Sequence, residues 1–92
     1  MSKLNLGRVV VTSGIADFVS DDIPRNIALR NLLIRHANGD WGDVDEEDHS
    51  ANDIALLQSS RVLSSYRLAD RKVWVITEAD RSSTTVLFPE EY

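Results

Sequence analysis

The sequence predicts an α+β fold in the order β-α-α-β-β-β, in which an antiparallel sheet carries two helices packed on one face. Three observations predict it. A β-branched run lies near the amino terminus, apolar residues recur at helical spacing through the middle, and three β-rich runs joined by short polar turns follow. A chain of 92 residues can build one core, so we expect a single domain over residues 1–92.

The first strand is expected at residues 7–12, where three consecutive valines are typical of a strand. Ser13 and Gly14 indicate the exit from this strand. The short apolar piece at residues 15–19 is long enough for one helical turn.

The first long helix is expected over residues 24–37, since proline is favoured at a first helical position. Apolar side chains recur along it at mixed helical spacings and predict a broad buried face: Ile27, Leu29, Leu32, Leu33, Ile34 and Ala37. The basic side chains are then expected mostly on its outer side: Arg25, Arg30, Arg35 and His36.

The second long helix is expected over residues 44–59. Gly39 suits the end of the preceding helix, and Asp43, three residues before Glu46, has the spacing of a helix cap with a capping-box partner. The amino-terminal half of this second helix is almost entirely polar. We therefore expect this half to project from the core or to frame a cleft.

Three strands are expected at residues 61–68, 73–77 and 84–88, with Pro89 ending the last. Residues 73–77 are the most apolar run, which favours a central strand. The sheet face away from the helices is expected to be solvated or to bind a partner. A secondary candidate surface there consists of Arg61, Tyr66, Arg67, Trp74 and Arg81.

Composition excludes several classes. The chain has no cysteine, which rules out disulfides, thiolate nucleophiles and cysteine zinc sites. Its net charge of −5 argues against direct binding to nucleic acid or anionic lipid. No apolar run is long enough to span a membrane, and the amino terminus does not have the features of a signal peptide. We expect a soluble, cytoplasmic protein.

Negative charge is concentrated in one stretch, because residues 40–53 carry seven carboxylates and no lysine or arginine. Two glycines flank Asp40 and Trp41 there. Trp41 is either an aromatic anchor for a partner or a core residue, and acids at a helix start also favour the positive end of the helix dipole. The candidate partner-binding residues are Asp40, Trp41, Asp43, Asp45, Glu46, Glu47 and Asp48.

Several segments carry a family resemblance over roughly residues 7–92. They include Gly39-Asp40-Trp41-Gly42-Asp43, Glu46-Glu47-Asp48, residues 61–66, residues 74–81 and residues 84–92. The chain resembles an uncharacterised family of short bacterial proteins of plasmids and other mobile elements, described as plasmid-related proteins. The resemblance implies a mobile-element setting and transfers no catalytic residue. The turn at residues 69–72 departs from the family in lacking a glycine, which concerns the hairpin geometry.

No catalytic or metal motif is complete. His36 and His49, with Asp40, Glu46 or Glu47, match no metal spacing, and the acidic run lacks the ligand order of a calcium loop. No serine lies in a nucleophile elbow and no glycine-rich phosphate loop exists. We therefore expect no enzymatic activity, no metal and no cofactor.

The predicted function is a protein-binding module of mobile-element origin. Its acidic surface would inhibit a host nucleic-acid-targeting defence system, of anti-CRISPR or anti-restriction type, by engaging a basic or nucleic-acid-binding protein surface. Two alternatives stay open. One is a toxin–antitoxin component with an RNase-toxin-like fold that uses the secondary surface. The other is a self-associating structural protein, in which residues 73–77 or the strand ending at Pro89 pair across a homodimer.

Overall fold

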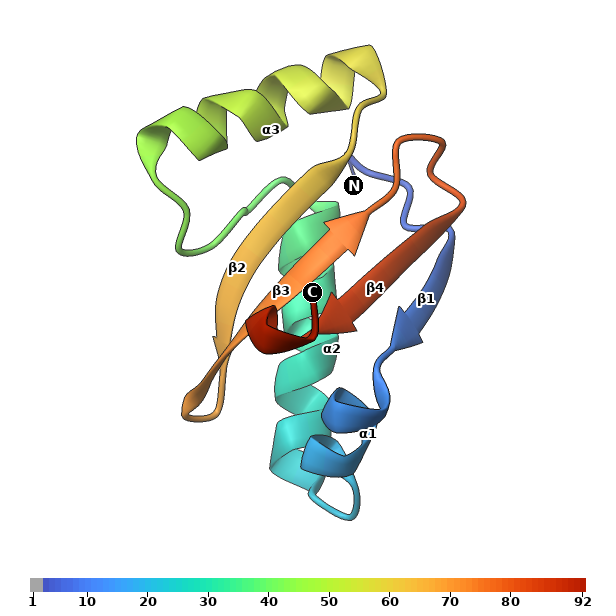
Figure 1. Cartoon of the computed structure of the whole chain (residues 1–92), viewed down its shortest axis with the longest axis vertical. Helices are drawn as coiled ribbons and strands as arrows, with labels where there is room; N and C mark the ends of the chain where they lie inside the picture. The colour runs from blue at the N-terminus through green and yellow to red at the C-terminus, as the bar shows by residue number, and fades with distance from the viewer. Residues whose placement is uncertain (1–2) are drawn as a thin grey trace.

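The computed structural model of the protein describes residues 3–92. Its fold class is α+β, and its strands form one four-stranded sheet (Figure 1). The elements, in chain order, are β1 (Arg8–Val11), α1 (Ser13–Val19), α2 (Ile23–Ala37), α3 (Glu46–Gln58), β2 (Val62–Leu68), β3 (Arg71–Thr77), β4 (Ser83–Leu87) and the 3-10 helix η1 (Pro89–Glu91). No helix within residues 3–92 is long and apolar enough to cross a membrane.

The sheet is mixed, with the strand order β1-β4-β3-β2. β2 pairs antiparallel with β3, and β3 pairs antiparallel with β4, but β1 runs parallel to β4. The prediction of a purely antiparallel sheet is therefore wrong for one pair. The short turns after β2 and β3 force antiparallel pairing, whereas the long connection from β1 to β4 permits either direction.

The helices differ from the prediction in number and in one boundary. Residues 13–19 form a complete short helix, α1, so the structure has three α-helices. α2 begins at Ile23, where the Asp22 side chain accepts a hydrogen bond from the Arg25 N–H. α3 begins at Glu46 rather than near Val44, because residues 41–43 form a β-bridge to Ser65 of β2 instead of a helical turn.

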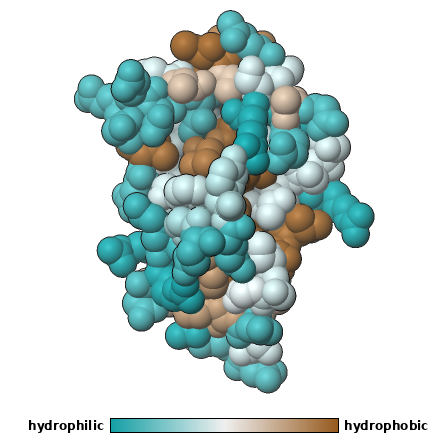
Figure 2. All heavy atoms as spheres, viewed as in Figure 1, coloured by the Kyte–Doolittle hydropathy of each residue, from teal (hydrophilic) through white to brown (hydrophobic). Residues whose placement is uncertain are grey.

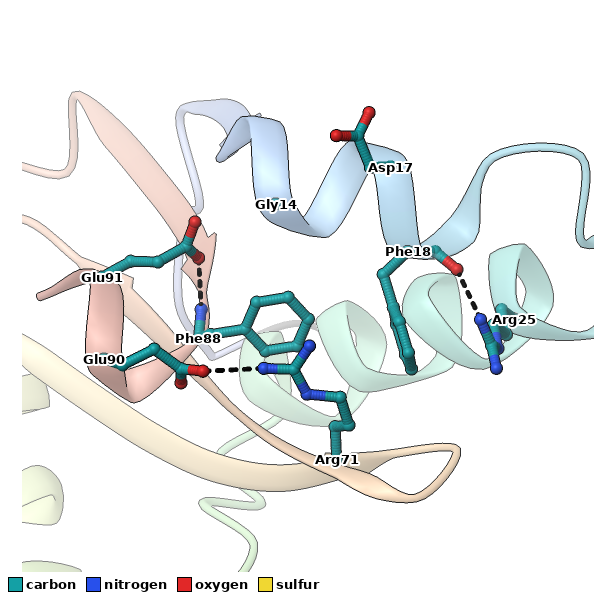
Figure 3. A pocket seen from close by; sticks show the side chains of 8 residues that line it. All are labelled: Gly14, Asp17, Phe18, Arg25, Arg71, Phe88, Glu90 and Glu91. Atoms are coloured by element: carbon teal, nitrogen blue, oxygen red, sulfur yellow. Dashed lines mark hydrogen bonds and ion pairs between the residues drawn. The ribbon is translucent and has the colours of Figure 1, made fainter.

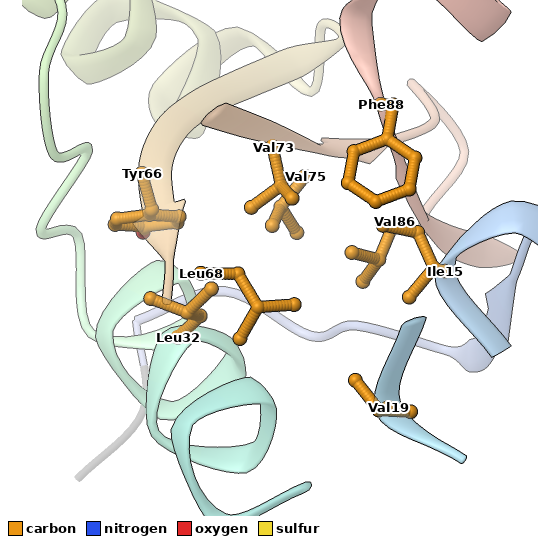
Figure 4. Close-up of a cluster of buried hydrophobic side chains, with 9 residues drawn as sticks. All are labelled: Ile15, Val19, Leu32, Tyr66, Leu68, Val73, Val75, Val86 and Phe88. Atoms are coloured by element: carbon orange, nitrogen blue, oxygen red, sulfur yellow. The ribbon is translucent and has the colours of Figure 1, made fainter. Parts of the chain in front are cut away.

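The main core lies between one face of the sheet and the helices α1 and α2 (Figure 4). Its buried side chains are Ile15, Val19, Leu32, Tyr66, Leu68, Val73, Val75, Val86 and Phe88. A second, smaller cluster joins α3 to the end of the sheet through Leu4, Trp41, Ala55 and Val62. α3 thus crosses the end of the sheet beside β2, instead of lying flat on the face as predicted (Figure 1).

The β2–β3 hairpin closes without glycine. Ala69 takes the left-handed conformation there, with φ of 56°, in the turn where the family resemblance leads one to expect glycine. β2 and β3 still pair in full register from Val62 opposite Thr77 to Leu68 opposite Arg71. The left-handed conformation of Ala69 costs some local backbone strain and leaves the strand pairing intact.

The two edges of the sheet differ. Along β2, the Ser65 N–H donates to the Trp41 carbonyl at 3.1 Å, and the Asp43 N–H donates to the Ser65 carbonyl. The Asn52 amide forms two more hydrogen bonds with the backbone of Leu63. β1 forms the other edge, and no strand of the described residues 3–92 lies beyond it. The strands predicted to pair across a homodimer, β3 and β4, are both interior strands, so that part of the self-association alternative is wrong.

Candidate functional site

Trp41 belongs to the core. Its side chain is 1% exposed, its Nε1–H donates to the Asp53 carboxylate at 3.0 Å, and its ring meets that of His36 edge to face. Gly42 permits this close approach, because a Cβ there would lie 2.1 Å from the Ser65 carbonyl oxygen. Of the two alternatives for Trp41, the core is correct, and the prediction of an anchor that inserts into a partner is wrong.

Asp40 is tied to α2. Arg35 donates to its carboxylate from Nε at 2.7 Å and from a terminal nitrogen at 3.2 Å. This hydrogen bonding is the main cause that holds the pKa of the Asp40 carboxyl below its ordinary value. The same guanidinium lies over the ring of Tyr66, 4.7 Å from its centroid. Asp40 therefore has its charge balanced within the chain.

The acids that follow are exposed and have no such partner. We define the acidic surface as Asp43, Asp45, Glu46, Glu47 and Asp48. None of these side chains forms an ion pair within residues 3–92. Asp45 is the true cap of α3, since its side chain accepts from the Asp48 N–H at 2.8 Å, and the prediction that Asp43 has this role is wrong. The helix dipole favours these charges at the start of α3.

Two hollows adjoin the acidic surface. The larger, of about 400 Å³, is lined by Val44, Glu46, His49 and Ser50. The smaller, of about 150 Å³, is lined by Val44, Asp48, Ala51, Asn52 and Leu63. Each hollow combines aliphatic groups with a carboxylate.

At the other end of α3 the side chain of Leu57 is 88% exposed, and Ile54 is half-exposed.

The secondary candidate residues do not form one site. Tyr66 is buried on the helix-covered face, where its O–H donates to the Asp40 carbonyl and burial raises its pKa to about 12. Arg81 donates to the carbonyls of Ala55 and Ser60 at the end of α3. The structure therefore assigns both residues to the scaffold, and sequence patterns gave no sign of the Arg81 contacts.

The other three lie on or beside the open face. Arg61 pairs with Glu78 at 3.5 Å and donates to the Tyr92 hydroxyl at 2.7 Å, and the Tyr92 ring meets Trp74 edge to face. Arg67 is exposed on β2, the edge strand. Two aromatic rings, Trp74 and Tyr92, thus lie together on the open face, with Arg61 and Glu78 beside them.

His36 is fully buried, so its predicted place on the outer side of α2 is wrong. The Thr84 hydroxyl donates to the Leu6 carbonyl at 2.7 Å, so the Thr77 hydroxyl must donate to Thr84. His36 Nε2–H then donates to Thr77, and Nδ1 accepts from the Ser64 hydroxyl. Ser64 is fully buried too, so this serine–histidine pair lies in the core, closed off from solvent.

A hollow of about 560 Å³ lies between α1 and the carboxyl-terminal turn (Figure 3). Its two cationic groups are already engaged. Arg71 binds Glu90 at 2.7 Å and stacks on Phe88, 3.6 Å from the ring centroid. Arg25 donates to the Phe18 carbonyl at 2.9 Å. The hollow therefore offers an incoming anion no free cation among its lining residues.

Comparison with protein-family models, curated proteins and solved structures gives no match. The mobile-element setting stays a prediction from the sequence. Within residues 3–92 no three histidine, aspartate or glutamate side chains gather in a way that would hold a metal ion. Both ring nitrogens of His36 are engaged, and His49 pairs with Asp53 on α3.

Proposed function

We propose that the protein is a non-enzymatic binding module that engages a basic protein surface through α3. The observation that carries this proposal is the acidic surface, five exposed carboxylates with no cation of their own within residues 3–92. Their mutual repulsion is relieved when a basic partner binds. Long-range attraction between opposite charges also speeds the encounter.

The hollows beside the acidic surface suit lysine or arginine side chains. In the smaller hollow, an aliphatic stem would lie on Val44 and Leu63 while its charged end meets Asp48. In the larger, the charged end would meet Glu46. The exposed Leu57 supplies an apolar contact at the other end of the helix. A partner surface that combines basic and aliphatic side chains would therefore complement this face of the protein.

The finer form of the proposal concerns the identity of the partner. A protein that handles nucleic acid presents a basic groove, and an acidic helix can occupy it in place of the phosphate backbone. The family resemblance supports a host defence complex as this partner, and the protein would then act as its inhibitor.

The test compares two variants of equal charge change. One carries Glu46→Gln, Glu47→Gln and Asp48→Asn, and the other carries Asp17→Asn, Asp21→Asn and Asp70→Asn at exposed acids elsewhere. Tagged wild type and variants capture partners from bacterial lysate at low and high salt, with circular dichroism as the check on folding. We expect a salt-sensitive, nucleic-acid-handling protein that only the first variant loses.

Three results would contradict the proposal. Undiminished capture by the folded α3 variant removes the acidic surface from the mechanism. Equal loss in both variants leaves only an effect of net charge. Recovery of ribosomes or of a small antitoxin-like protein would instead favour the toxin–antitoxin alternative.

A further inference from the structure

The backbone of β1 has one hydrogen-bonded side and one open side. The Arg8 N–H donates to the Ser82 carbonyl at 3.0 Å, and the Thr12 N–H donates to the Val86 carbonyl at 3.1 Å. In a parallel pair the residues alternate, so Val9 and Val11 direct their N–H and C=O groups away from β4. No strand within residues 3–92 lies on that side.

Within residues 3–92 this open edge has no proline, no bulge and no covering strand; of the usual protections it has only its four-residue length and the charge of Arg8. Free edges are usually guarded by proline, by a bulge, by an inward-pointing charge or by a covering segment, as residues 41–43 and Asn52 cover β2. β1 is a regular run of one arginine and three valines. Val9 and Val11 point to the helix-covered face and are 42% and 38% exposed. Figure 2 shows hydrophobic atoms at the right-hand margin, where Figure 1 places β1.

We propose that β1 pairs antiparallel with β1 of a second copy, about a two-fold axis through Val10, to give a continuous eight-stranded sheet. The outward-facing N–H and C=O groups of Val9 and Val11 then all find hydrogen-bond partners. Val9 of one copy lies opposite Val11 of the other, and Val11 of the first copy lies opposite Val9 of the second. The two pairs form four backbone hydrogen bonds. Every central side chain in this register meets another valine, which is a favourable cross-strand pair.

Charge complementarity identifies a second copy as the occupant. The same register sets Arg8 opposite Thr12 of the second copy, on the face away from the helices. The Thr12 hydroxyl donates to the Glu91 carboxylate at 2.8 Å. Cross-strand Cβ atoms lie about 5 Å apart, so the Arg8 guanidinium reaches the second copy's Glu91. Neither Arg8 nor Glu91 forms an ion pair within residues 3–92 of its own chain. The two-fold axis makes this contact twice.

The experiment is sedimentation equilibrium over about 1 µM to 1 mM protein, a range chosen for micromolar affinity. We expect the mass of the wild type to rise from 10.3 kDa toward twice that value. Val9→Pro removes a donor that crosses to the second copy and no internal bond, so this variant stays at the monomer mass. Arg8→Glu places like charges together twice and weakens association at least tenfold at low salt.

Arg67→Glu is the matched control, since Arg67 is an exposed arginine on the opposite edge of the sheet and should leave association unchanged. If Val9→Pro fails to fold, hydrogen exchange on the wild type replaces it. The amides of Val9 and Val11 should then become protected as concentration rises.

Any of four results would overturn the pairing. They are a wild type that stays monomeric throughout, a folded Val9→Pro dimer, equal weakening by Arg67→Glu and Arg8→Glu, and a dimer in which the Val9 and Val11 amides gain no protection. Binding of an unrelated extended peptide to β1 of a monomer would likewise assign the edge to another occupant.

Discussion

Burial of His36 couples the stability of the protein to pH. Desolvation, aided by the nearby charge of Arg81, lowers the pKa of the imidazole from 6.5 to about 4. The unfolded chain therefore takes up a proton at a higher pH than the folded one. The stabilisation is complete above pH 6.5 and is lost as the pH falls from 6.5 toward 4.

We predict that the His36 contribution to the free energy of unfolding falls by about 2–3 kcal/mol between pH 7.5 and pH 4.5. Urea unfolding measures the loss, and NMR titration of the imidazole measures the pKa directly. His49→Asn, which removes the exposed histidine, should keep the pH dependence. A His36 ring that titrates near its ordinary pKa would contradict the prediction.

At the scale of single residues, the sequence was least informative about the surroundings of each side chain. Helical spacing placed His36 and the arginines together on an outer face, yet His36 lies in the core beside Trp41. Its polar partners, Ser64 and Thr77, come from strands 28 and 41 residues further along. A single-sequence pattern describes the periodicity of one segment and contains no information about which distant hydroxyl groups meet it.

At the scale of elements, the Asn52 side chain forms the backbone hydrogen bonds at the outer edge of β2 that a neighbouring strand would otherwise form. Its amide nitrogen donates to the Leu63 carbonyl at 2.7 Å, and its amide oxygen accepts from the Leu63 N–H at 3.3 Å. Asn52 is buried, so water replaces these bonds poorly when the side chain is shortened. This contact fastens α3 to the edge of β2.

We predict that Asn52→Ala lowers the free energy of unfolding by about 1–3 kcal/mol, because two backbone groups of Leu63 lose their partners. Asn31→Ala on α2 is the control, since Asn31 is exposed and should change stability by no more than about 0.5 kcal/mol. Urea unfolding of both variants gives the comparison. Equal effects of the two substitutions would show that the Asn52 bonds add nothing specific.

The sequence predicted the elements well and their arrangement less well. The bounds of α2 were correct to within one residue, because Pro24 and the apolar periodicity mark a helix clearly. Its predicted buried face was too wide, since Ile27 and Ile34 are each 54% exposed. α3 started later than predicted, since the backbone pairing of residues 41–43 with Ser65 links segments far apart in the sequence. The direction of β1 was not predictable for the same reason. The acidic surface, a local feature of composition, was found from the sequence, whereas the burial of Trp41 required the fold.

For the whole molecule, association at β1 would make thermal stability depend on concentration. Ligands and partners that bind only the folded state raise the unfolding midpoint by mass action. We predict that the midpoint of the wild type rises between about 10 µM and 1 mM protein while that of folded Val9→Pro stays constant. Differential scanning calorimetry measures both. A constant midpoint for the wild type would contradict the prediction.

The covered edge of β2 limits growth. A chain with two bare edges can add copies without end, as amyloid-forming strands do. Here one side is closed by the backbone of residues 41–43 and by the Asn52 amide. Pairing through β1 would therefore stop at two molecules. Loosening the loop around Trp41 would turn a finite assembly into a template for fibres, so the segment that holds the acidic helix in place would also serve as a safeguard of solubility.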